Sequence, residues 1–312
     1  MNETTGRILQ QVNSVVIGKE EVTEKVLMAV LAQGHVLLED VPGVGKTTMA
    51  LAFARTLGLD SRRVQFTSDT MPSDIIGFSV YNKDIGAFDF KSGAVMTNLL
   101  LADEINRTSS KTQSALLEAM EEYQVTVDGQ TYPLPEPFVV LATQNPVGSA
   151  GTQLLPSSQL DRFMIRTTMG YPDRQSQLEI LRERHHENPL DRLEGVVTKE
   201  ELLQLTEQAR QVHIAESIYD YIVELVSATR SNEYIDLGIS PRGALALCRM
   251  AKAHGFVRGR DFVTPEDVYE VFDAVCAHRL VLSAKARLGK LTAEEITCRI
   301  REQVAVPQVA AL

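Results

Sequence analysis

The stretch DVPGVGKTT, which begins at Asp40, combines residue types that can hold a phosphate. Gly43 and Gly45 let a backbone turn sharply and aim its amides at phosphate oxygens, Lys46 adds a positive charge, and Thr47 offers a hydroxyl for Mg²⁺. The strict pattern begins with glycine, but this chain has Asp40. Because an acidic side chain aimed at phosphates would repel them, we expect Asp40 to face outward. The stretch predicts a phosphate-binding loop; the alternative is a plain strand-to-helix turn.

Two acids end the apolar run LLLADE (99–104). Charged groups are costly in apolar surroundings unless they have a partner, so a buried strand that ends in Asp103 and Glu104 needs a reason. A nucleotide site would supply one: Asp103 would hold Mg²⁺ through water, and Glu104 would orient and deprotonate the attacking water. Together with Lys46 earlier in the chain, these acids predict Mg²⁺-dependent hydrolysis of ATP.

A third apolar run, PFVVLAT (137–143), is followed by Gln144 and Asn145. Ligands of open α/β sheets bind beyond the carboxyl ends of the strands, where Asn145 would lie. There it could position the lytic water against the γ-phosphate. The alternative is that Asn145 only starts a turn, since Asn-Pro pairs commonly do so.

Two arginines complete the set of candidate catalytic residues. Arg162, in QLDRF, precedes a short apolar strand, and its simplest role is an ion pair with Asp161. Arg242, in SPRGALAL, lies in the first turn of a helix capped by Ser240, where a cation opposes the helix dipole unless an anion is near. We therefore expect Arg242 to approach the γ-phosphate from a second domain.

The elements that must position these residues alternate between strands and helices up to about residue 172. Continuous apolar runs at 35–39, 98–102 and 137–143 are typical of parallel strands covered on both faces, and helical patterns separate them. This alternation predicts an α/β, doubly wound parallel sheet over residues 1–172. Residues 173–312 lack strand-like runs and contain repeated helix caps, which predicts an all-helical C-terminal domain; the capping residues are Thr198, Ser240, Thr264 and Thr292.

Two segments interrupt the alternation. The stretch 78–90 reads as two short strands around a polar turn, and 123–134 contains Asp128-Gly129, a strong hairpin signal. Both are predicted to project from the sheet. They are either surface decoration or contacts with a substrate or a neighbouring subunit.

Composition sets broad limits on the protein class. The chain has 312 residues, 44% of them hydrophobic and 23% charged, which is ordinary for a globular protein of two domains. The net charge of −10 argues against a broad basic surface for nucleic acid, although a local basic groove stays open. Three scattered cysteines, no signal-like start and no apolar run of membrane-spanning length predict a reduced, cytoplasmic setting without a membrane span.

In this order, the motifs resemble those of AAA+ ATPases: a P-loop (Walker A), an acidic strand end (Walker B), sensor 1 at Asn145, an arginine finger at Arg162 and sensor 2 at Arg242. Longer stretches resemble the MoxR family, many members of which also lack glycine where Asp40 stands. Ser157 departs from the glutamate that relatives often carry there. The stretches are VIGKEEV (16–22), LLEDVPGVGKT (37–47), LLADEINRTSSKTQSALLEAMEE (100–122), ATQNP (142–146), LPSSQLDRF (155–163) and SPRGALAL (240–247).

The resemblance implies an AAA+ P-loop core with a helical lid, binding ATP and Mg²⁺. It implies a homo-oligomeric ring, usually a hexamer, in which Arg162 reaches the nucleotide of the adjacent subunit. Members act as chaperone-like factors that remodel or mature other proteins, often with a von Willebrand A domain partner, and some assist metal cofactor insertion. The nucleotide-binding residues that it implies are Ile17, Gly18, Pro42, Gly43, Val44, Gly45, Lys46, Thr47 and Thr48, with Thr47 and Asp103 at the metal.

Two other functions compete with this one. A nucleic-acid-stimulated AAA+ motor would need a basic contact surface, for which HGFVRGRDF (254–262), with Arg258 and Arg260, is the candidate. A scaffold that binds nucleotide without hydrolysing it is the second, and the presence of both Glu104 and Asn145 argues against it.

Overall fold

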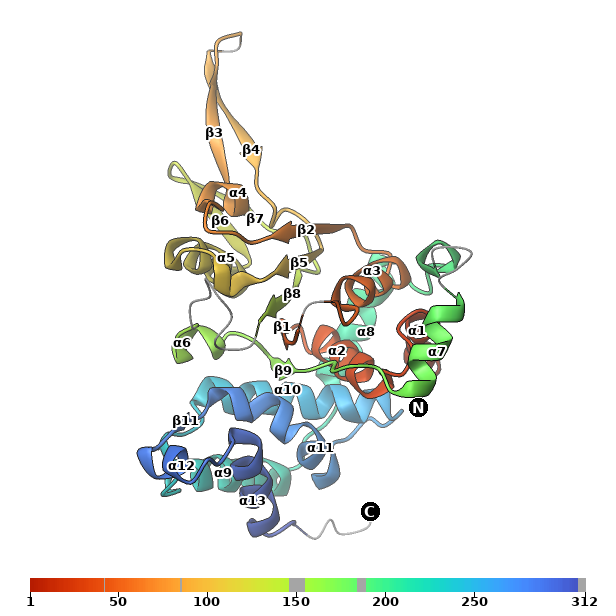
Figure 1. Ribbon diagram of the computed structural model, residues 1–312, viewed down its shortest axis with the longest axis vertical. Helices are drawn as coiled ribbons and strands as arrows, with labels where there is room; N and C mark the ends of the chain where they lie inside the picture. The colour runs from red at the N-terminus through yellow and green to blue at the C-terminus, as the bar shows by residue number, and fades with distance from the viewer. Residues whose placement is uncertain (42, 85, 146–154, 184–188, 308–312) are drawn as a thin grey trace.

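The computed structural model describes residues 1–41, 43–84, 86–145, 155–183 and 189–307. Its centre is a five-stranded parallel sheet in the order β2-β5-β8-β1-β9, which confirms the doubly wound α/β core (Figure 1). Because all neighbouring strands in this sheet are parallel, each connection between them has to cross over a face of the sheet. The strands are β1 (Val36–Glu39), β2 (Ser61–Gln65), β5 (Leu99–Asp103), β8 (Val139–Gln144) and β9 (Ile165–Thr167).

Helices cover both faces of this sheet, which is why its central strands are apolar up to their carboxyl ends. Alternate strand residues enter different clusters: Leu38 and Leu101 pack with the helices α1 to α3, whereas Leu37 and Leu100 pack with α5. Side chains of successive strand residues point to opposite faces, so a continuous apolar run needs cover on both sides. The covering helices are α1 (Glu3–Asn13), α2 (Glu20–Leu31), α3 (Lys46–Thr56), α4 (Pro72–Ile76) and α5 (Ser110–Glu122).

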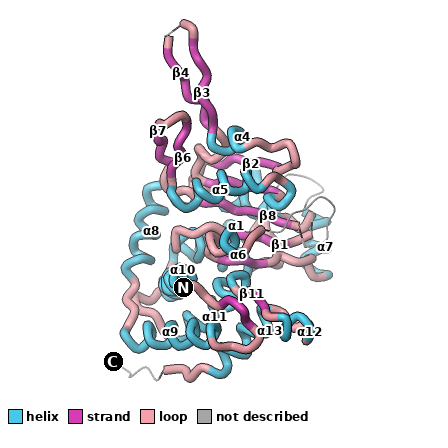
Figure 2. Tube along the Cα trace, turned by 90° about the vertical axis from the view of Figure 1, so that its left-hand side faces the viewer, coloured by secondary structure: helices cyan, strands magenta, loops and turns pink. Residues whose placement is uncertain are grey.

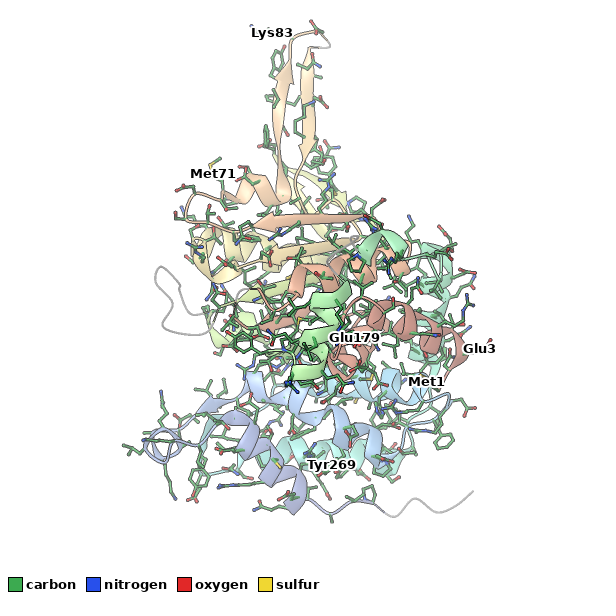
Figure 3. All side chains as sticks on the ribbon, turned by 45° about the vertical axis from the view of Figure 1, so that its right-hand side comes forward. Met1, Glu3, Met71, Lys83, Glu179 and Tyr269 are labelled. Carbon is green, nitrogen blue, oxygen red and sulfur yellow. The ribbon has the colours of Figure 1, made fainter. Side chains whose placement is uncertain are left out.

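Two hairpins occupy the stretches where the sequence predicts them. The longer one, β3 (Gly77–Asn82) with β4 (Ala87–Ser92), projects far from the body and carries Lys83 near its tip (Figures 1, 2 and 3). The shorter one, β6 (Gln124–Val127) with β7 (Gln130–Pro133), lies beside its base, where Tyr132 stacks on Phe90 with ring centroids 3.9 Å apart. The stacked rings therefore join the two hairpins.

The C-terminal part is helical, as predicted, apart from one short antiparallel pair, β10 (Ile235–Leu237) with β11 (Val281–Leu282). The side chains of Thr198, Ser240 and Thr292 accept amide hydrogen bonds at the predicted helix starts, and Thr264 forms a capping box. The helices are α7 (Arg174–Glu183), α8 (Lys199–Gln211), α9 (Glu216–Arg230), α10 (Pro241–Val257), α11 (Pro265–Cys276), α12 (Ala284–Leu288) and α13 (Ala293–Gln303).

The two parts share a continuous apolar core. Leu27 and Leu31 of α2 belong to the same buried cluster as Leu205 of α8 and Leu247 of α10. A division at residues 172 and 173 therefore stays a prediction from sequence. Short helices α6 (Ser157–Leu160), η1 (Ile105–Arg107), η2 (Pro189–Arg192) and η3 (Ala277–Arg279) complete the fold. Among the described residues, no helix is long and apolar enough to cross a membrane.

Candidate nucleotide-binding site

The carboxyl ends of three neighbouring strands bring the candidate residues together. Parallel pairing places Glu39 of β1 opposite Gln144 of β8, and Ala102 of β5 opposite Ala142 of β8. The amide of Asp40 continues this ladder by donating to the carbonyl of Gln144 at 3.2 Å. The loop that leads to Lys46, the acids that end β5 and Asn145 after β8 therefore share one edge of the sheet.

The loop before α3 has the backbone that phosphate binding requires. Its φ angles are 87° at Gly43 and 103° at Gly45, a left-handed region that favours glycine. A Cβ atom added at Gly43 would meet nothing within 4 Å among the described atoms. Thr47 and Thr48, both half-buried, follow in the first turn of α3, so their amides lie at its positive end. Val44 is half-buried against the core, and Pro42 lies outside the described residues.

Lys46 is directed into this site from the start of α3. Its ammonium donates to the carbonyls of Asp40 at 2.8 Å and Val41 at 3.3 Å. Burial lowers the pKa of Lys46, while the charges of Asp40, Asp103 and Glu104 act to raise it. The ammonium thus lies within electrostatic range of the acids at the end of β5, where a nucleotide phosphate would need its charge.

Asp40 does not face outward, so that expectation is wrong. The residue is buried, with 7% of its surface exposed, and its Oδ2 accepts hydrogen bonds from the amides of Met169 at 2.6 Å and Gly170 at 2.7 Å. Its Oδ1 accepts from the amide of Val41 at 3.0 Å. The chain leaving β9 passes beside the loop and offers two donors that a carboxylate satisfies and a glycine could not. Asp40 therefore anchors the start of the loop to the segment that leads into α7.

The acids after β5 are held by specific partners. Asp103 accepts from Nε of Arg63 at 2.8 Å and from Oγ1 of Thr143 at 3.1 Å. Glu104 has a left-handed backbone (φ 58°), which is uncommon for a residue other than glycine and is stabilised by a hydrogen bond from its amide to Thr143 at 2.9 Å. The Glu104 carboxylate pairs with Arg107 at 2.8 Å, and this hydrogen bond is the main reason that its pKa is lowered. Glu104 is thus ionised at neutral pH, as a general base must be.

Asn145 lies at the same edge and has a buried side-chain oxygen, Oδ1, without a hydrogen-bond partner among the described residues. Its backbone exchanges hydrogen bonds with the side chain of Asn106, at 3.4 Å and 3.2 Å, and its side chain also bonds to Glu104. Because buried polar atoms are nearly always paired, the Oδ1 oxygen is suited to accept a hydrogen bond from a water or a ligand. The donor and acceptor set of the edge therefore suits a nucleotide with a bound Mg²⁺.

The segment expected to border the adenine lies next to this loop. Gly18 has φ of 69°, and a Cβ there would come within 2.1 Å of Oγ of Ser176 in α7. The ammonium of Lys19 donates to the carbonyl of Tyr171 at 3.0 Å. Since Asp40 holds residues 169–170, half-buried Ile17 and exposed Gly18 are linked to the phosphate loop through residues 171–176.

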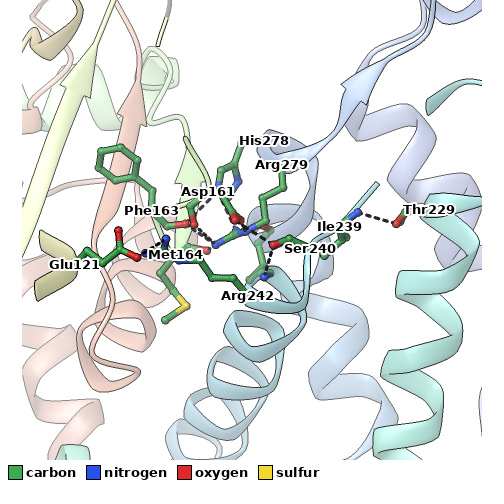
Figure 4. A network of polar contacts seen from close by, with 12 residues as sticks. Glu121, Asp161, Phe163, Met164, Thr229, Ile239, Ser240, Arg242, His278 and Arg279 are labelled. Carbon is green, nitrogen blue, oxygen red and sulfur yellow. Dashed lines mark hydrogen bonds and ion pairs between the residues drawn. The ribbon is translucent and has the colours of Figure 1, made fainter. Parts of the chain in front are cut away.

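Arg162 and Arg242 lie together, but away from the phosphate loop. Both pair with the carboxylate of Glu121 at the end of α5: Nε of Arg162 at 3.1 Å and Nη1 of Arg242 at 3.0 Å (Figure 4 shows Arg242 and Glu121). All three residues line a cavity of about 360 Å³. One guanidinium comes from the core and one from the lid, so the cavity bridges the two parts.

This cavity lies at the amino end of β1, the edge opposite Lys46. His35, just before β1, contacts the carbonyl of Met120 at 2.9 Å, and the hydroxyl of Tyr123 donates to the carbonyl of Gln33 at 3.1 Å. The five residue steps from His35 to Asp40 span about 16 Å at roughly 3.3 Å per residue. The expected approach of Arg242 to the phosphates of its own chain is therefore corrected: the position of the lid places it beside Arg162 instead.

Comparison with known proteins agrees with this geometry. The model of the "ATPase family associated with various cellular activities (AAA)" matches residues 35–165, and that of the AAA lid domain matches residues 227–299. Chaperone MoxR1 of Mycobacterium tuberculosis is 40% identical over 318 residues, which cover 99% of this chain and 84% of that protein. The chain belongs to the MoxR family of AAA+ ATPases.

Two further relatives resemble this MoxR-family chain along most of its length. YeaC of Bacillus subtilis, whose function is uncharacterised, is 46% identical over 302 residues, covering 97% of this chain and 94% of that one. The crystal structure of a candidate ATPase from Cytophaga hutchinsonii matches with a TM-score of 0.91 and 40% identity, covering 98% of this chain and 95% of that one.

Reasoning from the sequence missed several residues of the MoxR-type site. Arg63 lies in the polar edge strand β2, and Glu121 is on the polar face of an amphipathic helix, so both look like ordinary surface residues. Asn106 and Arg107 follow the two acids after a single residue, Ile105, and this position was a usable signal. Thr143 is fully buried in the structure, where its hydroxyl bonds to Asp103 and to the amide of Glu104. In the sequence, its only signal was a hydroxyl residue at the end of an apolar run, which needs a partner once buried.

Proposed function

We propose that this MoxR-family chain hydrolyses Mg²⁺-bound ATP at the carboxyl edge of its sheet and uses the energy to remodel or mature other proteins, as a ring that is usually a hexamer. The observation that carries the proposal is the meeting of Lys46, Asp103, Glu104 and Asn145 at the ends of three adjacent strands.

Each residue has a role that its contacts support. The amides of the glycine loop and the ammonium of Lys46 hold the phosphates, with the positive end of α3 behind them. Thr47 and Asp103 would hold Mg²⁺, which neutralises phosphate charge when bound. Glu104, kept ionised by Arg107, accepts the proton of the attacking water, and Asn145 orients that water.

The arginine pair supports action between subunits. Arg162 and Arg242 share a cavity with His35 at the amino end of β1, and the chain from His35 to Asp40 at the start of the phosphate loop spans about 16 Å. A ring that places the amino edge of one sheet against the carboxyl edge of the next would bring both to a neighbour's nucleotide. An arginine supplied in this way is worth ~10³–10⁵ in rate, so an isolated subunit should be nearly inactive.

Mixed assemblies test this function. Glu104→Gln should bind ATP but not hydrolyse it, and Arg162→Ala should bind ATP with little turnover. Mixing the two should restore hydrolysis, because the Glu104→Gln subunits supply Arg162 to the intact sites of the other variant. Arg210→Ala is the matched control, since Arg210 forms an exposed pair with Glu207 on the lid surface. No turnover above that of the separate variants would refute the arrangement.

The client and the partner follow from the family alone. A relative is named a chaperone, which supports protein remodelling, and we propose a von Willebrand A domain protein as partner and the cytoplasm as the location. The three cysteines are free thiols, in keeping with a reducing compartment. Capture of partners with the Glu104→Gln form in the presence of ATP would test both.

The nucleic-acid motor is disfavoured. Arg258 pairs with Glu24, and Arg260 forms hydrogen bonds of 2.7 Å and 2.6 Å to the two carboxylate oxygens of Asp267. Both guanidinium groups of the candidate basic cluster are thus engaged within the chain. DNA-stimulated hydrolysis that disappears when both arginines are neutralised would restore that alternative.

A further inference from the structure

Arg279, in η3 of the lid, donates hydrogen bonds to Asp161 and Phe163, which Figure 4 labels and which flank Arg162 in the sequence. Only 3% of its side chain is exposed. One guanidinium donates to the carbonyls of Phe163 at 2.7 Å, Met164 at 3.2 Å and Asp161 at 3.3 Å. It also donates to the Asp161 carboxylate at 2.8 Å. The short segment that carries Arg162 is therefore fixed to the lid through four acceptors.

Asp161 also bonds to the N-cap of α10, the helix that carries Arg242. Its second carboxylate oxygen accepts a hydrogen bond from Oγ of Ser240 at 3.0 Å. Ser240 is the N-cap of α10, where its Oγ accepts from the amide of Gly243 at 3.1 Å. Arg242 lies between those two residues. The carboxylate of Asp161, the residue before Arg162, thus bonds both to Arg279 and to Ser240, the cap of α10.

The packing is adapted to this guanidinium. A Cβ on Gly243 would come within 2.9 Å of Cδ of Arg279, so the glycine leaves the space that the side chain occupies. Buried ion pairs seldom stabilise a fold more than well-packed apolar residues would. Stability alone is therefore a weak reason for a buried arginine here, whereas orientation of the Arg162 segment is a direct consequence of its contacts.

We propose that Arg279 is a positioning residue: through Asp161 and Ser240 it holds Arg162 and Arg242 as one rigid unit for presentation to the nucleotide of the next subunit. The inference rests on the proposed function and extends it to a residue that touches no nucleotide. It also requires that the lid and the Arg162 segment of one chain move together during the ATPase cycle.

Arg279→Lys tests the proposal because it keeps the charge but removes the planar group that reaches four acceptors at once. ATP affinity should stay within about 2-fold, since the phosphate loop is at the other edge, while turnover should fall about 10- to 100-fold from misplacement of the arginines. The matched control is Arg301→Lys. Arg301 is a half-buried lid arginine, with 14% of its side chain exposed, and its partners Tyr269 and Asp273 both lie in the lid. This variant should keep normal turnover.

Mixing variant subunits distinguishes a loss of arginine positioning from a damaged fold. Glu104→Gln subunits carry correctly held arginines, so adding them should restore turnover at the intact sites of Arg279→Lys subunits. If Arg162→Ala is rescued in this way but Arg279→Lys is not, positioning by Arg279 is wrong and the proposed function stands. If neither is rescued, both fail. Asp161→Asn, which keeps the shape of the side chain, should repeat the pattern if Arg279→Lys does not fold; normal turnover in that variant would also overturn the inference.

Discussion

Replacing Asp40 by glycine would complete the phosphate-loop pattern, yet we expect it to damage the protein. In a buried position, the Oδ2 atom of the Asp40 carboxylate accepts two hydrogen bonds, of 2.6 Å and 2.7 Å, from the amides of Met169 and Gly170. Asp40→Gly leaves both amides without this acceptor and adds backbone freedom to the loop. The first motif residue would match the pattern better while the loop lost its anchor to the chain leaving β9.

The size of the effect follows from those two contacts. Leaving a buried donor unsatisfied costs about 1–3 kcal/mol, so two amides cost roughly 2–6 kcal/mol, with a central value of about 4 kcal/mol. At about 2–4 °C per kcal/mol, the thermal midpoint should fall by roughly 8–16 °C. Both amides bond to Oδ2 alone, so Asp40→Asn can keep both bonds through its single side-chain oxygen. It should lose less than the glycine variant, chiefly the hydrogen bond from the amide of Val41.

The assay is thermal unfolding without nucleotide, followed by intrinsic tyrosine fluorescence, for wild type, Asp40→Gly and Asp40→Asn. The expected order of midpoints is wild type, then asparagine, then glycine. A glycine variant within about 2 °C of wild type would show that the amides of Met169 and Gly170 find other partners, and the anchoring role of Asp40 would be wrong.

The remaining predictions concern titration and packing. Arg107→Ala removes the main cause of the lowered pKa of Glu104, so the acid limb of the turnover profile should shift to higher pH; an unshifted limb would mean that another group titrates. Burial alone would raise the pKa of Asp267, but hydrogen bonds from His254 and Arg260 lower it, so its contribution to stability should be lost below about pH 4. Asp267→Asn should remove that part of the acid dependence, measured by unfolding from about pH 7 down to about pH 2. Gly18→Ala should weaken ATP binding through its clash with Ser176, and adding Ser176→Gly should recover part of the affinity, as titration with a fluorescent ATP analogue would show.

The sequence by itself determined the helices and strands, and the edge of the sheet at which the candidate nucleotide-binding residues meet. Apolar runs long enough for buried strands, each followed by polar residues, predict that Lys46, Asp103 and Asn145 meet, because parallel strands end at a common edge. Capping residues were equally readable, since a cap acts on amides only three positions away, as at Thr198 and Glu201.

Only the tertiary structure decided how the parts combine. The outward orientation expected for Asp40 failed because its partners, Met169 and Gly170, are distant in sequence and become neighbours only when β9 pairs with β1. The place of Arg242 depended on how the lid packs on the core, which no local pattern encodes. Its partner Glu121 looks like any solvated residue and stays exposed in the structure; only the packing of the lid brings Arg242 to it. Long-range packing therefore placed Arg242 beside Arg162 and away from the phosphate loop of its own chain, which local patterning could not foresee.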